Sequence, residues 1–201
     1  SNSWFLTTFA REVGAHAFRV HTIPETADQL KLIIEDQLVR ADLIVISGES
    51  KDESFDLITS VISTLGEIQI VTPKLAESSK HSFGLIGPDK TPVVVLPGDP
   101  ISNFLSAELF IKPMITKMLT GVNTDKPNKK VKLTKSVTSP SGVASYIRGE
   151  LNADGQVSPL ADQESLMTLS KANCLITLGE KEEKLNSGDS VNIIHLNQDR
   201  R

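Results

Sequence analysis

The chain has 201 residues, of which 39% are hydrophobic and 23% are charged, with a formal net charge of -4 and a pI near 5.6. This length exceeds that of a typical single domain and predicts two modest domains. The composition is that of a globular protein, which excludes the disordered and fibrous classes. Nucleic-acid binding is also excluded, because a phosphate backbone demands a basic face and the Lys and Arg residues here are few and scattered.

Cysteine and hydropathy patterns indicate the compartment. Cys174 is the single cysteine, so no intrachain disulfide or thiolate metal cluster can form, and a reducing cytoplasm is favoured. No apolar run approaches the roughly 20 residues of a membrane span. We therefore expect a cytoplasmic protein without a membrane span, with Cys174 in the core. The histidines lack the spacing of metal ligands and are expected on the surface or in strands; they are His16, His21, His81 and His195.

The first 121 residues alternate helical and strand patterns. The expected helices are Ser3–Val13, Thr26–Arg40, Asp56–Leu65 and Ser102–Leu119. The expected strands are Ala17–Val20, Leu43–Ile46, Ile68–Val71 and an antiparallel hairpin of Ser82–Ile86 with Val93–Leu96. The unbroken apolar run Leu43–Ile46 is typical of a strand buried on both faces of a parallel sheet. The alternation predicts an α/β fold with a doubly wound, mostly parallel sheet.

Beyond Gly121 the sequence changes character. Residues 122–130 are polar and suit a linker between a domain at 1–121 and a second domain at 131–201. The second domain carries short β-patterned runs and one helical turn, Ser165–Ala172, which predicts a small all-β barrel or sandwich. The β-patterned runs are Val131–Val137, Ala144–Leu151, Cys174–Leu178 and Val191–Leu196.

Two loops follow expected strands at their carboxyl ends, where ligands bind in open α/β sheets. They are Ser47–Phe55 and Pro97–Ser102. In Pro97-Gly98-Asp99-Pro100 the glycine allows backbone to approach a ligand, and the following helix offers free N–H groups to an anion. The same tetrapeptide is equally read as a rigid strand-to-helix turn capped by Asp99 or Ser102.

Several motifs occur in an order that matches a known family. They are Leu43 to Gly48, Asp56, Leu65-Gly66-Glu67-Ile68, the hairpin, Leu96 to Pro100, Thr138 to Gly142, Tyr146-Ile147-Arg148 and Leu169 to Ile176. The chain resembles the MoeA/gephyrin-type molybdopterin molybdenumtransferases over nearly its whole length. The resemblance implies a MoaB/MogA-like α/β domain at 1–121 and the family's C-terminal β domain at 131–201. It also implies that the chain, which begins inside a family motif, lacks the first strand and is a fragment, inactive alone.

Such enzymes insert molybdate into adenylated molybdopterin with Mg²⁺, and their cleft is completed by the partner subunit of a homodimer. The resemblance implies that Asp56 is the catalytic and Mg²⁺-binding residue. Its carboxylate also suits a bond to a pterin amine, or an acidic first-turn position that favours the helix dipole. The implied ligand-binding residues are Ser47, Gly48, Pro97, Gly98, Asp99, Pro100 and Ser102. Arg148 matches a family arginine, with a structural salt bridge or a surface position as the alternative.

The chain departs from the family pattern in its loops. Glu49 replaces a glycine, Asp99 replaces an asparagine, and Ala76–Lys80 lacks both family lysines. Each added carboxylate repels a phosphate, by roughly 1.7 kcal/mol at about 10 Å and an effective dielectric of about 20. The acidic loop from Glu49 to Asp56 is read as a solvated loop or a cation site. The alternative to a molybdenumtransferase is therefore a catalytically degenerate MoeA/gephyrin-like dimeric scaffold that binds a protein partner.

Overall fold

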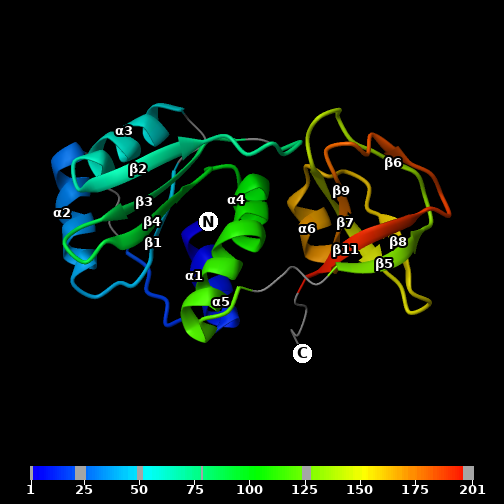
Figure 1. Ribbon diagram of the computed structural model, residues 1–201, viewed down its shortest axis with the longest axis horizontal. Coiled ribbons are helices and arrows are strands. Elements are labelled where there is room, and N and C mark those ends of the chain that lie inside the picture. Colours follow the sequence, from blue (N-terminus) through cyan, green and yellow to red (C-terminus); the bar gives the residue numbers. More distant parts are fainter. Residues whose placement is uncertain (1, 21–25, 49–51, 78, 124–127, 197–201) are drawn as a thin grey trace. The chain divides into compact units, whose positions relative to one another are not determined.

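The computed structural model describes residues 2–20, 26–48, 52–77, 79–123 and 128–196 (Figure 1). The chain divides into two compact units. The first comprises Ser1–Pro73 and Ser79–Asn123, and the second comprises Lys74–Ser78 and Thr124–Arg201. A short segment from the first half of the sequence therefore belongs to the second unit. No helix in the described part of the chain is long and apolar enough to cross a membrane.

The first unit contains a four-stranded sheet. Its order is β1 (Ile44–Ser47), β4 (Thr91–Leu96), β3 (His81–Ile86) and β2 (Gly66–Val71). β1 and β4 are parallel, whereas β3 is antiparallel to both β4 and β2. Three strands thus run in one direction and β3 opposes them. The mostly parallel sheet and the antiparallel hairpin are both confirmed.

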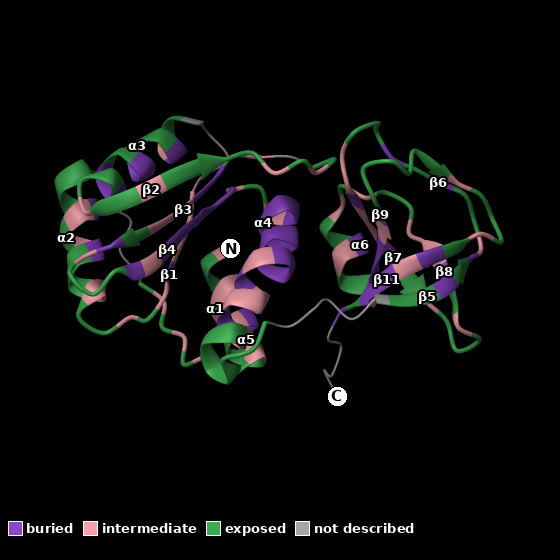
Figure 2. Cartoon of the chain, viewed as in Figure 1, coloured by how far each residue is buried: buried purple, intermediate pink, exposed green. Residues whose placement is uncertain are grey.

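Helices cover both faces of this sheet (Figures 1 and 2). They are α1 (Asn2–Val13), α2 (Ala27–Leu38), α3 (Asp52–Ser63), α4 (Pro100–Ser106), η1 (Ala107–Ile111) and α5 (Lys112–Thr120). Side chains alternate along β4, so Val93 and Val95 join one core with α2 and α3. Val94 and Leu96 join the opposite core with α1, η1 and α5. This two-sided burial of an apolar strand produces the expected three-layer α/β arrangement.

The helix that follows β4 runs continuously from Pro100 to Thr120 but widens in its middle into the π-helical segment η1. Pro113 lies just after this segment and has no N–H to donate to the preceding turn, which gives a physical reason for the local change of hydrogen-bond pattern. Gly121 ends the helix at φ 74°, the left-handed conformation that glycine adopts most readily. The sequence predicted this helix and its glycine end but not the π segment.

The second unit is a closed five-stranded barrel with the order β11-β5-β8-β7-β9. Its elements are β5 (Asn128–Leu133), β6 (Val137–Thr138), β7 (Ser145–Leu151), β8 (Gln156–Pro159), α6 (Leu166–Lys171), β9 (Cys174–Leu178), β10 (Lys184–Leu185) and β11 (Ser190–His195). Gly149 allows the barrel to close, because a Cβ there would lie 2.9 Å from Ile176 and 3.0 Å from Val157. The all-β prediction is thus confirmed, as a barrel.

The structure differs from the sequence predictions at three places. Ala17–Val20 is not a strand: no described strand pairs with it, and Phe18 is exposed. In β1 only Ile44 is buried, because the described strands pair with β1 on one side only. β5 begins at Asn128 and so includes the last residues of the expected linker.

A fourth difference concerns the segment before β3. Leu75 forms a parallel bridge with Ala144 of the second unit. The backbone N–H of Ala76 donates to Ala144 O, and the N–H of Ala144 donates to Lys74 O, both at 2.9 Å. This segment therefore belongs to the second unit, the β unit, although the sequence predicts it within the first unit, the α/β unit.

Candidate functional site

The two loops expected to form a site meet at the carboxyl ends of β1 and β4. Because these strands are parallel and Ser47 pairs with Leu96, their following residues leave the sheet side by side. The N–H of Gly48 donates to Leu96 O at 3.3 Å and continues the pairing past the strand end. The structure thus brings Ser47 and Gly48 against the Pro97–Pro100 loop.

The hydroxyl of Ser47 joins three segments of the first unit. Asn2, at the start of α1, donates through Nδ2 to Ser47 Oγ at 3.0 Å and to Gly98 O at 2.8 Å. Asn103 donates through its own Nδ2 to Ser47 Oγ at 3.2 Å and to Pro97 O at 3.0 Å. Two amides therefore fix the loop carbonyls to one serine. We call Asn2, Ser47 and Asn103 the amide hub.

Asn103 is fully buried, and its Oδ1 has no hydrogen-bond partner in the described structure. A buried acceptor without a donor costs about 1–3 kcal/mol, so such atoms are rare and often mark the position of a water or a ligand. The amide hub therefore contains one buried acceptor that lacks a donor in the described structure.

Asp99 is the cap of α4. Its Oδ2 accepts the N–H of Ser102 at 2.7 Å, Pro100 occupies the first helical turn, and Asp99 O accepts the N–H of Asn103 at 2.8 Å. This resolves the choice between Asp99 and Ser102 in favour of Asp99. The helix start already holds a carboxylate, which makes it less receptive to a phosphate than its backbone alone suggests.

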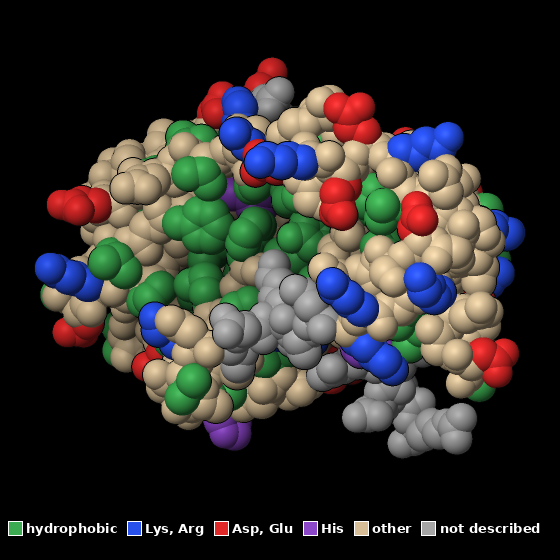
Figure 3. Space-filling model, turned by 45° about the vertical axis from the view of Figure 1, so that its right-hand side comes forward, with side chains coloured by type: hydrophobic (Ala, Val, Ile, Leu, Met, Phe, Trp, Pro, Cys, Tyr) green, Lys and Arg blue, Asp and Glu red, His purple; other side chains and the backbone are tan. Residues whose placement is uncertain are grey.

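Asp56 makes none of the contacts described above for the amide hub and the cap of α4. It is exposed and sits in the second turn of α3, which begins at Asp52, so the first-turn alternative does not hold. No group of three His, Cys, Asp or Glu residues that could hold a metal ion occurs within the described ranges. Glu49, Ser50 and Lys51 lie outside those ranges. Figure 3 shows acidic and basic side chains interspersed on one face rather than gathered by sign.

Arg148 has the structural role that was its alternative. Its side chain is fully buried within the second unit, and Nη2 donates to Glu77 Oε1 at 3.3 Å. Its Nε and Nη1 have no partner in the described structure. Lys74 of the same segment lies 3.8 Å from Glu180 in an exposed ion pair.

The remaining titratable side chains form no catalytic constellation among the described residues. His16 and His195 are exposed, whereas His81 is buried in β3 and lies 2.6 Å from Ser106 through Nε2 and Oγ. His21 lies outside the described residues. Burial raises the pKa of the Cys174 thiol to about 11, as expected of a core cysteine.

Two family models match the chain, and they divide it near the same place as the structure does, apart from the Lys74–Ser78 segment. Residues 1–117 match the "Probable molybdopterin binding domain", and residues 130–196 match the "MoeA C-terminal region (domain IV)". The first match alone spans more than half of the chain. The chain belongs to the MoeA/gephyrin family. The amide hub thus lies in the molybdopterin-binding domain of a MoeA-type protein.

Relatives agree with this assignment. Molybdopterin molybdenumtransferase 1 of Mycobacterium tuberculosis is 30% identical over 207 residues, covering 98% of this chain and 49% of the relative. Gephyrin of Dictyostelium discoideum is 24% identical, covering 96% of this chain and 32% of its own. A structure of the Pyrococcus horikoshii MoeA protein superposes with a TM-score of 0.79 at 23% identity, covering 97% of this chain and 47% of that one. The chain thus spans about half the length of the molybdenumtransferases it matches.

Sequence reasoning found the loops but missed both asparagines of the hub. Asn2 is the first residue of α1, where the sequence alone suggests no more than a helix-capping role. Asn103 carried one usable signal: it is a polar residue on the buried face of a helix next to the proline loop.

Proposed function

We propose that this chain supplies the molybdopterin-binding part of an enzyme that inserts molybdate into adenylated molybdopterin during molybdenum cofactor biosynthesis. The observation that carries this proposal is the buried, unpartnered Oδ1 of Asn103 in the amide hub, at the carboxyl ends of two parallel strands. The names of the relatives and the family match support the substrate class.

In this proposal the chain's own residues bind and orient the substrate. A pterin carries amine and ring N–H donors, one of which would satisfy the unpartnered Oδ1 of Asn103 once the loops that cover it admit the ligand. Ser47 holds that amide in its orientation, because Asn103 Nδ2 is committed to Ser47 Oγ and Pro97 O. Gly48 and Gly98 let backbone approach the ligand closely. Asp99 weakens the attraction for the substrate phosphate, since its negative charge offsets the positive end of the helix dipole at the start of α4.

Asp56 is the proposed Mg²⁺ ligand. Mg²⁺ is commonly held by one or two carboxylates together with substrate phosphates and water, so a single exposed carboxylate on α3 fits the ion when the substrate is present. Held there, Mg²⁺ would neutralise phosphate charge. We propose that a homodimer completes the cleft, on the basis of the family resemblance.

The second candidate is a catalytically degenerate dimeric scaffold that binds a protein partner. Asp99 favours it, because the carboxylate at the helix start repels the anion that an insertase must hold. Titration calorimetry with molybdopterin, adenylated molybdopterin and molybdate separates the two candidates. We expect the pterin ligands to bind, and no heat with any of the three would reject the insertase in favour of the scaffold.

Two variants locate the binding. Asn103→Leu removes both amide atoms, and Ser47→Ala removes the hub hydroxyl; each is expected to weaken pterin binding by about tenfold or more. Ser60→Ala on the exposed face of α3 is the matched control and should bind normally. Circular dichroism confirms folding. Restored molybdoenzyme activity in a host that lacks its own insertase, when the full-length protein is supplied, would exclude the degenerate scaffold.

A further inference from the structure

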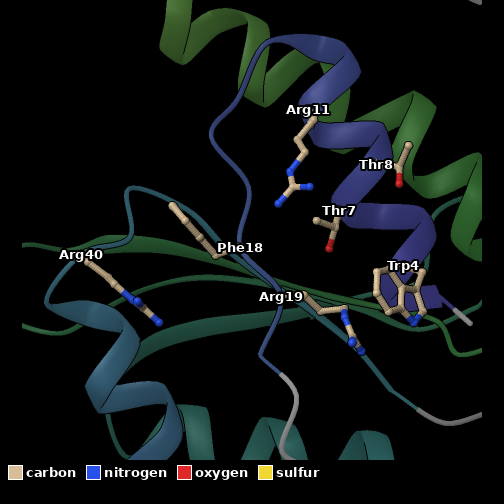
Figure 4. Close-up of a pocket in the computed structure, with 7 residues that line it drawn as sticks. All are labelled: Trp4, Thr7, Thr8, Arg11, Phe18, Arg19 and Arg40. Atoms are coloured by element: carbon tan, nitrogen blue, oxygen red, sulfur yellow. The ribbon is translucent and has the colours of Figure 1, made fainter.

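A hollow lies on the first unit along α1, and none of its lining residues belongs to the amide hub. It is a cavity of about 410 Å³ lined by Trp4, Thr7, Thr8, Arg11, Phe18, Arg19 and Arg40. α1 supplies four of these residues, the stretch after α1 supplies Phe18 and Arg19, and Arg40 follows α2 (Figure 4). A volume of this size suits a small molecule.

The lining is strongly cationic. Three of the six arginines in the sequence line this hollow, and none of the lining residues within the described part of the chain is acidic, although the whole chain carries a net charge of -4. The side chains of Arg11 and Arg40 enter from opposite sides (Figure 4). A convergence of guanidinium groups is the arrangement that recognises phosphate or carboxylate.

Two of these arginines are held in position by contacts that leave donors for a ligand. Arg11 donates through Nε and Nη2 to Ala17 O at 3.1 and 2.7 Å. Arg40 donates through Nε and Nη2 to Gln37 Oε1 at 3.1 and 2.7 Å. A guanidinium has five N–H donors, so the Nη1 hydrogens of both remain for an anion. Preorganisation of this kind lowers the entropy cost of binding.

Aromatic rings orient the guanidinium groups further. Arg19 Cζ lies 3.9 Å from the centroid of the Trp4 ring, and Arg40 Cζ lies 5.9 Å from that of Phe18. Both rings are largely exposed, at 63% and 76%. These rings therefore form part of the wall of the hollow and not of the hydrophobic core, and each packs against a guanidinium group.

We propose that this hollow, the arginine pocket, binds a small organic molecule with two or more phosphate or carboxylate groups. The site is separate from the amide hub, and the proposal does not depend on the insertase function. With two anionic groups, one ligand would contact Arg11 on α1 and Arg40 beyond α2 together, and the hydroxyl of Thr8 adds a hydrogen-bond donor on the α1 side.

The chain reports on this pocket through its own fluorescence, since Trp4 is the single tryptophan. Titrations use inorganic pyrophosphate, ADP and citrate at low salt, with calorimetry as the second readout. We expect a saturable change in Trp4 emission with a Kd below about 1 mM for at least one probe, weakening as salt is raised. A comparison of the affinities for pyrophosphate and ADP with the affinity for citrate distinguishes phosphate recognition from carboxylate recognition.

The double variant Arg11→Gln with Arg40→Gln tests the assignment. Both side chains are exposed, so the fold should persist, and binding is expected to weaken at least tenfold. The matched control, Lys117→Gln with Lys171→Gln, removes the same charge from exposed helical positions outside the pocket and should bind as the parent does. Equal affinity of the two double variants, or no saturable signal and no heat with all three probes, overturns the proposal.

Discussion

The guanidinium of Arg148 is fully buried in the β unit, and Glu77, from a segment that precedes β3 in the sequence, lies 3.3 Å from it. Glu77 is 37% exposed at its side chain, so water shares in the compensation of the buried charge. Two further guanidinium nitrogens are buried without a partner in the described structure. The ion pair therefore links the segment that contains Glu77 to the barrel, and Glu77 is the main compensation for the buried positive charge of Arg148.

Removal of the carboxylate should destabilise the β unit. Loss of one partner of a buried pair costs about 3–5 kcal/mol, and the partial exposure of Glu77 reduces this for Glu77→Gln to about 2 kcal/mol. Urea unfolding followed by circular dichroism measures it. Glu180→Gln breaks the exposed pair with Lys74 and is the control, with an expected change below about 0.5 kcal/mol. Equal effects would show that burial does not decide the value of these pairs.

Two substitutions of Asp99 separate the effect of its capping hydrogen bond from the effect of its negative charge. Asp99→Ala removes the acceptor of the Ser102 N–H and should lower stability by about 1 kcal/mol. Asp99→Asn keeps a capping oxygen and should be nearly neutral in stability. It should also bind a phosphate-bearing pterin several-fold more tightly, since one negative charge is removed. A loss of stability in Asp99→Asn equal to that in Asp99→Ala would contradict the capping role.

Acid sensitivity should arise in part from His81. Burial lowers the pKa of His81 below its ordinary value of 6.5, and the hydrogen bond with Ser79 O opposes this shift. As pH falls below about 6.5, the ring takes up a proton in the unfolded chain but stays neutral in the folded one. The free energy of unfolding therefore decreases as pH falls from about 6.5 to the lower pKa of the folded state.

The measurement is the free energy of unfolding between pH 7.5 and 5. We expect its decline to be shallower in His81→Gln than in the parent, whereas His16→Gln, at an exposed position, should follow the parent curve. Parallel curves for the parent and His81→Gln would contradict the prediction.

Cys174 should react slowly with thiol reagents. Its side chain is fully buried in β9, and the pKa of its thiol is raised to about 11, so little thiolate is present at pH 8. We expect labelling by a disulfide reagent to follow transient unfolding and to become fast in denaturant. Glu77→Gln should accelerate it, because opening of the β unit becomes easier. Fast labelling of the native parent would show that the barrel opens without unfolding.

Periodicity and strand direction explain which parts of the fold were predictable. The run Val93–Leu96 is apolar at every position, which requires cover on both faces, and parallel strands necessarily bring Ser47 and Pro97 together. Ala17–Val20 shows why pattern alone can mislead, since an extended segment becomes a strand only when a neighbour pairs with it.

The amide hub and the barrel's short added segment could not be read locally. The hub depends on contacts between Ser47 and asparagines 45 and 56 residues away, and nothing in the neighbouring sequence specifies them. Likewise, Lys74 to Glu77 has no periodic pattern, so its pairing with Ala144 follows only from the folded structure.

That added segment has a consequence for autonomy. A protein cut at Thr124 would retain every strand of the closed barrel yet leave Leu75 and Glu77 behind, with Arg148 deprived of its counter-charge. The two units are thus not interchangeable modules joined by a single crossing. Exchange of the barrel between relatives, or its expression by itself, would have to carry the Lys74–Ser78 peptide along.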